Sequence, residues 1–461
     1  MELVLMYVAS VLAIAAVVFM LLKKLDIKIT LLGVGMALIV IAMAMGKLPT
    51  KEFNDFMAPF NAIIDQFKAT LPKAGLIILI LGGYTAYMSK IGANDVTVNT
   101  LTKPLRGIRS AYVLVPIVFL LGNVLSLVIP SASNLAIILL ATLYPVLRKS
   151  GMSTLTAAAV IATTATVMPT PLGGDNVAIA QALGMDVSTY VFRYHAIVSV
   201  PTLFFMAFVH YFWQMYLDKK DLKKGIVRQE DLEIEALKTI NGGFLYKTVY
   251  TLLPLLPIVI LLLVYVFNLL AKGTDIGMSV ELVSLISFVI AIVCELIRKR
   301  NSKAVLEDTE SFFKGMGNAM GIVALLVAAG VFVQGLKSIG IITHLQDVMT
   351  TANVPGFTLP LILVLLSAVI VILSGSGTAL FYAMVPLMAP LALAAGISAY
   401  AVTVPMGLAG NLLRAVSPVS AVVVIVSGTT KQTPFNIVKR TAVPMVAGVV
   451  FMFVLSMLFF L

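Results

Sequence analysis

Residues 410–420 read "GNLLRAVSPVS" and place an arginine, Arg414, between two apolar stretches, "ISAYAVTVPMGLA" before it and "AVVVIVSG" after it. An arginine at the depth of a lipid bilayer costs at least about 2.5–3.5 kcal/mol on insertion scales, so a guanidinium there should serve a function. Pro418 follows four residues later and should interrupt the helix, because proline lacks the backbone N–H and clashes with the preceding turn. The stretch therefore predicts a broken membrane helix that carries a cation.

The composition places the whole chain in a membrane. Of its 461 residues, 60% are hydrophobic and only 11% are charged, and the mean hydropathy is +1.05. Apolar runs of about twenty residues recur along the chain, which is the length of a transmembrane helix. The sequence thus predicts an all-α polytopic protein surrounded by the lipid bilayer. Full spans are expected at about 3–22, 29–46, 74–90, 190–217, 248–270, 277–297, 318–337 and 435–461.

The basic residues predict an orientation. If the loop "KKLDIK" (23–28) is cytoplasmic, 24 of the 32 lysines and arginines lie on the cytoplasmic side, 7 lie outside, and Arg414 lies within the membrane. This bias follows the positive-inside rule and places both termini outside. The net charge of +11 then belongs to loops between spans, and no nucleic-acid partner is expected. Residues 3–22 have no basic segment before them and are expected to remain as the first span.

The sequence shows no motif typical of an enzyme: no metal-ligand cluster, no P-loop and no nucleophile elbow. Cys294 is the only cysteine, and the three histidines form no metal-ligand pattern. The stretch "GSGTALF" (375–381) loosely resembles a phosphate-binding loop, but it follows a membrane segment where a nucleotide-binding motif needs a strand. We therefore expect no enzymatic activity, no metal site and no cofactor, with H+ or Na+ as candidate coupling ions.

Three internal matches predict that the chain is a repeat. "GGYTAYMSKIG" (82–92) aligns with 330–340, "PSASNLA" (130–136) aligns with 373–379, and "VFRYHAIVSVP" (191–201) aligns with 434–444. The matches keep their order and nearly one offset. The predicted spans give the first half an odd number of crossings, so the second half should be inverted, as in many secondary transporters. The predicted division is a first repeat at 1–217, a cytoplasmic linker at 218–247 and a second repeat at 248–461.

Each half contains an apolar segment that should form a re-entrant helical hairpin. In the first half, 110–148 has the polar tip "PSASN" (130–134), and the arm after it is about 21 Å long as a helix, shorter than the ~30 Å hydrocarbon core. In the second half, 357–395 has the tip "SGSGT" (374–378). Non-helical backbone at this depth is tolerated where protein or a water-filled cavity satisfies it. The alternative is that the small residues form ordinary helix-packing faces.

A second interrupted segment follows each hairpin. In 154–184, Pro169 and Pro171 should stop a helix near Met168, and a new half-helix should begin near Asp175. Asp175 would then cap that helix, or bind a cation with the carbonyl groups that the break sets free. The equivalent in the second half is 398–428, which is broken around Pro418.

These four interruptions should converge on one site for an anion. Helix N-termini, hydroxyl groups and a guanidinium suit a carboxylate, which arginine binds in a bidentate manner. The alternative is that Arg414 forms a structural pair with Asp175, and the pair could also open on substrate binding. The predicted substrate-binding residues are Ser131, Ser133, Asn134, Thr170, Ser374, Ser376, Thr378, Asn411, Arg414 and Ser417. The predicted coupling-ion residues are Ser133, Asn134, Gly173, Asp175 and Gly377.

The connection between the second and third spans has a different pattern. Residues 51–75, "KEFNDFMAPFNAIIDQFKATLPKAG", carry apolar side chains at the spacing of an amphipathic helix. Such a helix is expected to lie along the membrane surface with its charged side chains in water.

Several stretches resemble the anaerobic four-carbon dicarboxylate carriers of the DcuC type, within the ion transporter superfamily. They are "KIGAND" (90–95), "YFWQMYLDKK" (211–220), "LLVAAGVFVQGLKSIG" (325–340), "GSGTALFYA" (375–383), "NLLRAVSPVSAVVV" (411–424) and "PFNIVKRTAVP" (434–444). The resemblance implies a carrier of the bacterial inner membrane, active in anaerobic respiration or fermentation, with a homodimeric scaffold. It also implies a Ser-Asn-Thr signature at each hairpin tip. Ser133 and Asn134 fit this signature, whereas Gly377 stands where an asparagine is expected.

The sequence therefore predicts a secondary active transporter of C4-dicarboxylates such as succinate, fumarate and malate. The resemblance implies succinate efflux or fumarate–succinate exchange. The first alternative is a carrier of amino acids or of another organic anion, coupled to H+ or Na+. A channel is the other alternative, and it would not show saturable counterflow.

Overall fold

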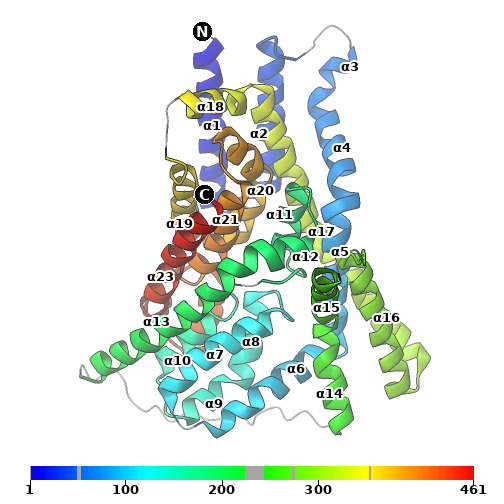
Figure 1. The fold of residues 1–461 in the computed structure, drawn as a ribbon, viewed down its shortest axis with the longest axis vertical. Coiled ribbons are helices and arrows are strands. Elements are labelled where there is room, and N and C mark those ends of the chain that lie inside the picture. Colours follow the sequence, from blue (N-terminus) through cyan, green and yellow to red (C-terminus); the bar gives the residue numbers. More distant parts are fainter. Residues whose placement is uncertain are drawn as a thin grey trace.

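A computed structural model describes residues 2–48, 53–108, 110–167, 169–223, 243–271, 276–351 and 355–461. These residues form helices joined by short connections, and no strand occurs in the described ranges. Figure 1 shows an elongated bundle in which the N-terminal helices and α18 (Ile341–Thr351) lie at one end and α9 (Tyr144–Lys149) lies at the other. Most of the predicted linker 218–247 falls outside the described residues. Its first residues belong to α13 (Ala196–Lys223), and its last residues begin α14 (Phe244–Leu252).

The described part of the chain contains nine helical segments that are long and apolar enough to cross a membrane. Eight of them cover the expected full spans, and the ninth is α20 (Gly377–Ala394), which was expected as one arm of a hairpin. The protein is thus a multi-pass, all-helical membrane protein. The eight segments at expected spans are α1 (Glu2–Leu22), α2 (Ile27–Ala44), Ala58–Lys90, Val187–Leu222, Phe244–Leu270, α16 (Val280–Lys299), α17 (Ser302–Ser338) and α23 (Pro434–Phe460).

The predicted surface helix is wrong for residues 58–75. α4 (Ala58–Thr70) is joined to α5 (Leu76–Lys90) by a π-helical turn (Leu71–Gly75) that is kinked at Lys73, where φ and ψ are −106° and −105°. α4 packs alongside α17 and α2 and so does not lie free on the membrane surface, although Phe60 and Ile64 of its apolar side remain exposed.

The long helix α17 packs against α5 and α2 of the first half so closely that the helix backbones are in contact. A Cβ atom on Gly315 would lie 2.5 Å from the carbonyl oxygen of Gly82 in α5. A Cβ atom on Gly35 of α2 would lie 2.7 Å from the backbone nitrogen of Phe332. Only glycine permits such close approaches. The two sequence halves are therefore interleaved, and α13 of the first half also packs along α23 of the second.

All four segments predicted to be interrupted are interrupted. In the first half, α7 (Ala111–Ser126) and α8 (Ala132–Thr142) flank the first tip, and α10 (Thr154–Ala162) and α11 (Gly174–Ala182) flank the first helix break. In the second half, α19 (Thr358–Ser374) and α20 flank the second tip, and α21 (Ala399–Arg414) and α22 (Ala421–Thr430) flank the second break. The inverted relation between the halves and the boundaries of the repeats stay predictions.

Candidate functional site

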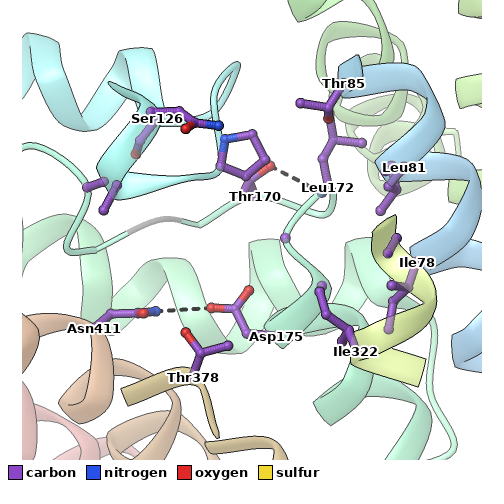
Figure 2. A pocket seen from close by; sticks show the side chains of 18 of the residues that line it. Ile78, Leu81, Thr85, Ser126, Thr170, Leu172, Asp175, Ile322, Thr378 and Asn411 are labelled. Atoms are coloured by element: carbon purple, nitrogen blue, oxygen red, sulfur yellow. Dashed lines mark hydrogen bonds between the residues drawn. The ribbon is translucent and has the colours of Figure 1, made fainter. Parts of the chain in front are cut away.

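Two adjoining cavities lie where the tips and the helix breaks meet. The central cavity, about 470 Å³, is lined from α5, α11, α17, α20 and α21 and by residues of the first tip. The tip cavity, about 560 Å³, is lined by both tips and by the loop between α1 and α2. The two cavities share Pro130, Ala132, Gly377, Thr378 and Arg414. Figure 2 shows Asp175, Thr378 and Asn411 facing one another in the central cavity.

Most of the predicted substrate-binding residues border these two cavities. Arg414 and Thr378 border both, whereas Ser417 borders neither. Ser417 is buried and donates a hydrogen bond to the carbonyl oxygen of Ile372, 2.8 Å away. The central cavity also contains Asn134, Thr170 and Asn411, and the tip cavity contains Ser131, Ser133, Ser374 and Ser376.

Arg414 is held by one backbone carbonyl group. Its Nη2 donates to the carbonyl oxygen of Ala165, 2.6 Å away, in the first helix break. Its other guanidinium nitrogens donate to no group in the described part of the chain. Arg414 is the last residue of α21, and the backbone between it and α22 contains Pro418. The break therefore places a half-buried cation between the two cavities with most of its donors available.

Asp175 lies in the first turn of α11, as the sequence predicted for a half-helix N-terminus. One carboxylate oxygen accepts from the backbone N–H of Asn176 at 3.0 Å, and the other accepts from the amide of Asn411 at 3.0 Å. A Cβ atom on Gly173 would lie 2.5 Å from Asp175 Oδ1. Glycine at position 173 thus leaves room for the carboxylate in the cavity.

Arg414 and Asp175 form no ion pair in the ranges that the structure describes. Each has another partner, Ala165 for the guanidinium and Asn411 for the carboxylate. Both nevertheless line the central cavity. The site therefore presents a cation and an anion separately to the same space, which does not match the alternative of a closed structural pair.

The first helix break is longer than the positions of Pro169 and Pro171 led us to predict. The helix was expected to stop near Met168, which lies outside the described residues, but α10 already ends at Ala162. The hydroxyl group of Thr163 donates to the carbonyl of Ala159, and that of Thr164 donates to Ile161. Hydroxyl groups that bond to the preceding turn compete with the helix. Pro169 and Pro171 lie within the break and keep it open as far as α11.

Asn123 of α7 satisfies the backbone of this break. Its side-chain oxygen accepts from the backbone N–H groups of Thr166 at 3.0 Å and Val167 at 3.3 Å. Its amide donates to Phe119 and, at 3.4 Å, to the carbonyl of Thr163. Asn123 is buried, and such side chains replace the hydrogen bonds that the helix has lost. It ties the first hairpin to the break that carries the Ala165 carbonyl.

The two tips differ in their construction. Ser131 caps α8 by accepting from the backbone N–H of Asn134 at 3.4 Å, so this serine is partly structural. In the second tip, Ser374 Oγ accepts from the N–H of Ser376 at 3.1 Å, and Gly375 has a φ of +75°. A Cβ atom on Gly377 would overlap the backbone carbonyl of Gly410 in α21. This close crossing explains why a glycine stands where the resemblance leads one to expect asparagine.

Sequence reasoning missed several residues of the site. Tyr382 and Gly174 line the central cavity, and a Cβ atom on Gly174 would lie 2.8 Å from Tyr382 Oη. Asn123 could have been found, because a polar residue in an otherwise apolar run marks a buried interaction. Other polar residues that the prediction left out are Thr85, Ser89, Ser126 and Asn318, all of which line the central cavity. Within the described ranges, no group of three His, Cys, Asp or Glu residues is placed to hold a metal ion.

Comparison with known sequences gives a match along almost the whole chain. The sequence model of the family described as "DcuC: C4-dicarboxylate anaerobic carrier" matches residues 2–461. The chain is 36% identical over 429 residues to the anaerobic C4-dicarboxylate transporter DcuC of Escherichia coli K12, covering 91% of this chain and 89% of that protein. It is 38% identical over 380 residues to the probable anaerobic C4-dicarboxylate transporter DcuC of Vibrio cholerae, covering 82% and 80%.

Two solved structures share the fold. The YdaH transporter of Alcanivorax borkumensis superposes with a TM-score of 0.64 at 18% identity, covering 89% of each chain. MtrF of Neisseria gonorrhoeae superposes with a TM-score of 0.60 at 14% identity, covering 93% of this chain and 94% of that one. At these identities the likeness concerns the fold alone. The first of these structures is described as a transporter and the second as one of a class of antimetabolite efflux pumps.

Proposed function

The chain belongs to the C4-dicarboxylate anaerobic carrier family, and from that premise we propose that it is a secondary active carrier of C4-dicarboxylates such as succinate, fumarate and malate. Alternating access would carry the substrate, with succinate efflux or fumarate–succinate exchange as the main mode. The proposed location is the inner membrane of a bacterium, because the named relatives are bacterial. A homodimer, implied by the resemblance alone, belongs to the same proposal.

One observation carries this proposal: Arg414 lies between the two cavities with most of its guanidinium unpaired among the described residues. A planar guanidinium binds a carboxylate through two parallel hydrogen bonds. The first carboxylate of the substrate would bind there. The second would reach hydroxyl and amide donors that line the same cavities, namely Ser131, Ser133, Asn134, Thr170, Ser374, Ser376, Thr378 and Asn411.

Asp175 is the proposed centre of coupling. Its carboxylate lines the central cavity at the start of α11, close to Gly173 and hydrogen-bonded to Asn411. A proton or a sodium ion bound there would neutralise the negative charge beside an anionic substrate, which links ion binding to substrate binding. Ser133, Asn134 and the backbone at Gly377 are the further proposed ion ligands, and broken helices commonly coordinate coupling ions in this way.

A carrier of amino acids is the second candidate, and the same carboxylate favours it. An α-amino acid needs a cation for its carboxylate and an anion for its ammonium group. Arg414 and Asp175 offer both to one cavity without pairing with each other in the described chain. Aspartate, which has two carboxylates and one ammonium group, would satisfy both arrangements. Competition between succinate and aspartate therefore separates the two candidates.

The deciding experiment is counterflow of labelled succinate in proteoliposomes that are preloaded with succinate or left empty, with and without a sodium or proton gradient. Uptake only into preloaded vesicles would establish exchange. Uptake into empty vesicles driven by one ion gradient would establish symport with that ion. Protein-free liposomes and competition by unlabelled fumarate, malate and aspartate are the controls. Absence of succinate flux in every condition would refute the proposal, and flux of labelled aspartate alone would establish the second candidate.

A further inference from the structure

A third cavity lies beyond the central one and has no part in the site described so far. This distal cavity, about 810 Å³, is lined by residues of α4, the π-helical turn, α11, α17, α18 and α20. Two lysines border it, Lys73 on the π-helical turn and Lys337 near the end of α17. The sequence prediction counted both lysines on the outer side of the membrane, and Lys73 lies at the kink within the segment Ala58–Lys90. The tip cavity, in contrast, includes Lys24 of the loop assigned to the cytoplasm.

Four chain segments line both the distal and the central cavity. On each segment, a residue that lines the central cavity and a residue that lines the distal cavity are three or four positions apart. Residues three or four positions apart lie one turn along a helix, which corresponds to about 5.4 Å. The barrier between the cavities is therefore about one helical turn thick. The pairs, central cavity first, are Ile78 and Ala74, Asp175 and Ala178, Ile322 and Leu326, and Tyr382 and Val385.

This barrier has a structural reason to be movable. Tyr382 lies against Gly174, where a Cβ atom would come within 2.8 Å of the tyrosine hydroxyl and 3.8 Å of Ile78 Cγ1. Pro386 follows Tyr382 by four residues in α20 and lines the distal cavity. Because proline has no N–H, the carbonyl group of Tyr382 lacks its helical partner, and α20 is weakened at the level of the barrier.

The distal cavity suits anions. Its polar side chains can all donate hydrogen bonds, and no aspartate or glutamate lines it. Lys73 and Lys337 are exposed, and neither forms an ion pair with another described residue. Like charges at the mouth of a cleft attract anions and raise their local concentration. The polar residues of the lining are Gln66, Thr70, Lys73, Gln181, Gln334, Lys337 and Thr343.

We propose that the distal cavity is the outer vestibule of the transport route and a second, low-affinity anion site, in which Lys73 and Lys337 collect carboxylates on the outer side of the Tyr382 barrier. The ligand class is small organic anions with one or more carboxylate groups. The identity of that anion rests on the proposed function, but the positive vestibule and its side of the membrane do not. The tests are therefore chosen to separate the two.

The first test uses thiol labelling and needs no substrate. In a Cys294→Ser background, which removes the only cysteine, Gln334→Cys reports on the distal cavity and Asn318→Cys reports on the central cavity from the same helix. Membrane-impermeant methanethiosulfonates carrying a sulfonate or a trimethylammonium group should label Gln334→Cys from outside. Asn318→Cys should react in inside-out vesicles. The measured quantity is the rate of labelling of Gln334→Cys by the sulfonate reagent divided by the rate with the trimethylammonium reagent. Adding Lys73→Gln and Lys337→Gln should lower this ratio by about tenfold at low salt.

The second test measures transport from each face. The Lys73→Gln/Lys337→Gln variant should raise the KM for succinate about tenfold in intact cells and leave the KM unchanged in inside-out vesicles. Lys73→Arg/Lys337→Arg should keep the wild-type KM, because the charge is retained. The matched control is Lys68→Gln, an exposed lysine of α4 that does not line the cavity.

Three results would overturn the vestibule: a labelling ratio that the lysines do not change, labelling of Gln334→Cys from the cytoplasmic face only, or an equal rise in KM on both faces. A wild-type protein that moves no dicarboxylate would refute the proposed function instead. In that case the labelling ratio still decides whether the vestibule attracts anions.

Discussion

At the scale of single residues, Arg414 is explained by where its hydrogen bonds go. A cation in membrane-type sequence is costly, and one bond to the Ala165 carbonyl does not use the five donors of a guanidinium. The remaining donors face the space shared by two cavities. This pattern is the reason that we propose Arg414 as a ligand-binding residue.

Arg414→Lys keeps the charge and loses the bidentate geometry, so we expect succinate transport to weaken while expression stays normal. The KM should rise about tenfold, which corresponds to the loss of one charge-assisted hydrogen bond of about 1.5 kcal/mol. Counterflow with the purified variant measures this. Arg193→Lys, at an exposed position in the turn before α13, is the matched control. A wild-type KM in Arg414→Lys would remove this residue from the binding site.

Asp175→Asn is nearly isosteric and removes the charge, so we expect transport to lose its dependence on the coupling ion while the protein still assembles. Gly173→Ala should produce a milder form of the same defect, because its methyl group would displace Asp175 Oδ1. Rates at several sodium concentrations and at several pH values measure the dependence. If Asp175→Asn fails to assemble, the carboxylate is structural.

The sequence located Arg414, Asp175 and Asn411 because a polar group in an apolar run is visible without coordinates. It did not reveal that Asp175 bonds to Asn411, since the two are 236 positions apart and their contact depends on packing. Arg440 shows the opposite error. It was counted among the 24 basic residues of the cytoplasmic side, yet its side chain is buried between α10, α13 and α23.

At the scale of elements, the positions of the interruptions could be predicted, and their lengths could not. Pro169, Pro171 and Pro418 mark both helix breaks, because proline acts locally. The end of α10 depends on Thr163 and on Asn123, which lies in another helix, so local pattern placed it too late. The position of α4 beside α17 and α2 was also missed, because it depends on packing between distant segments and not on local spacing.

At the second tip, α20 and α21 cross so closely that only glycine fits at position 377, and a substitution there tests this crossing. Gly377→Ala would place a methyl group on the backbone carbonyl of Gly410, and neither backbone can move without shifting α20 against α21. We expect the yield of folded protein and its Tm in detergent to fall, with a destabilisation of at least about 1–3 kcal/mol. Gly428→Ala, where a Cβ atom meets no other atom, is the control and should keep the wild-type Tm. An unchanged Tm in Gly377→Ala would mean that the crossing is looser than described.

At the scale of the whole molecule, α13 and α23 join the two halves through a buried ionic cluster. Arg440 of α23 donates to Asp218 and to Asp221 of α13, each at 2.6 Å, and to Thr156 of α10 at 2.9 Å. Ser153 donates to Asp218 at 2.7 Å. Every charge in the cluster has a partner, which is the condition under which buried charges are tolerated. The cluster lies on the elements that hold α10, and α10 leads directly into the break that carries Ala165.

Removing the Arg440 cation alone should therefore destabilise the protein far more than removing the charges of Arg440, Asp218 and Asp221 together. Arg440→Gln leaves two buried carboxylates uncompensated, and we expect a destabilisation of about 3–5 kcal/mol and a large loss of Tm in detergent. Arg440→Gln combined with Asp218→Asn and Asp221→Asn should recover most of that loss, because no unpaired charge is left. Lys439→Gln, an exposed neighbour in α23, should have no effect. If the single and triple variants were equally unstable, the cluster would act through its shape and hydrogen bonds rather than through charge balance. If the triple variant recovers stability and its KM for succinate is still raised, the cluster also positions the break that supports Arg414.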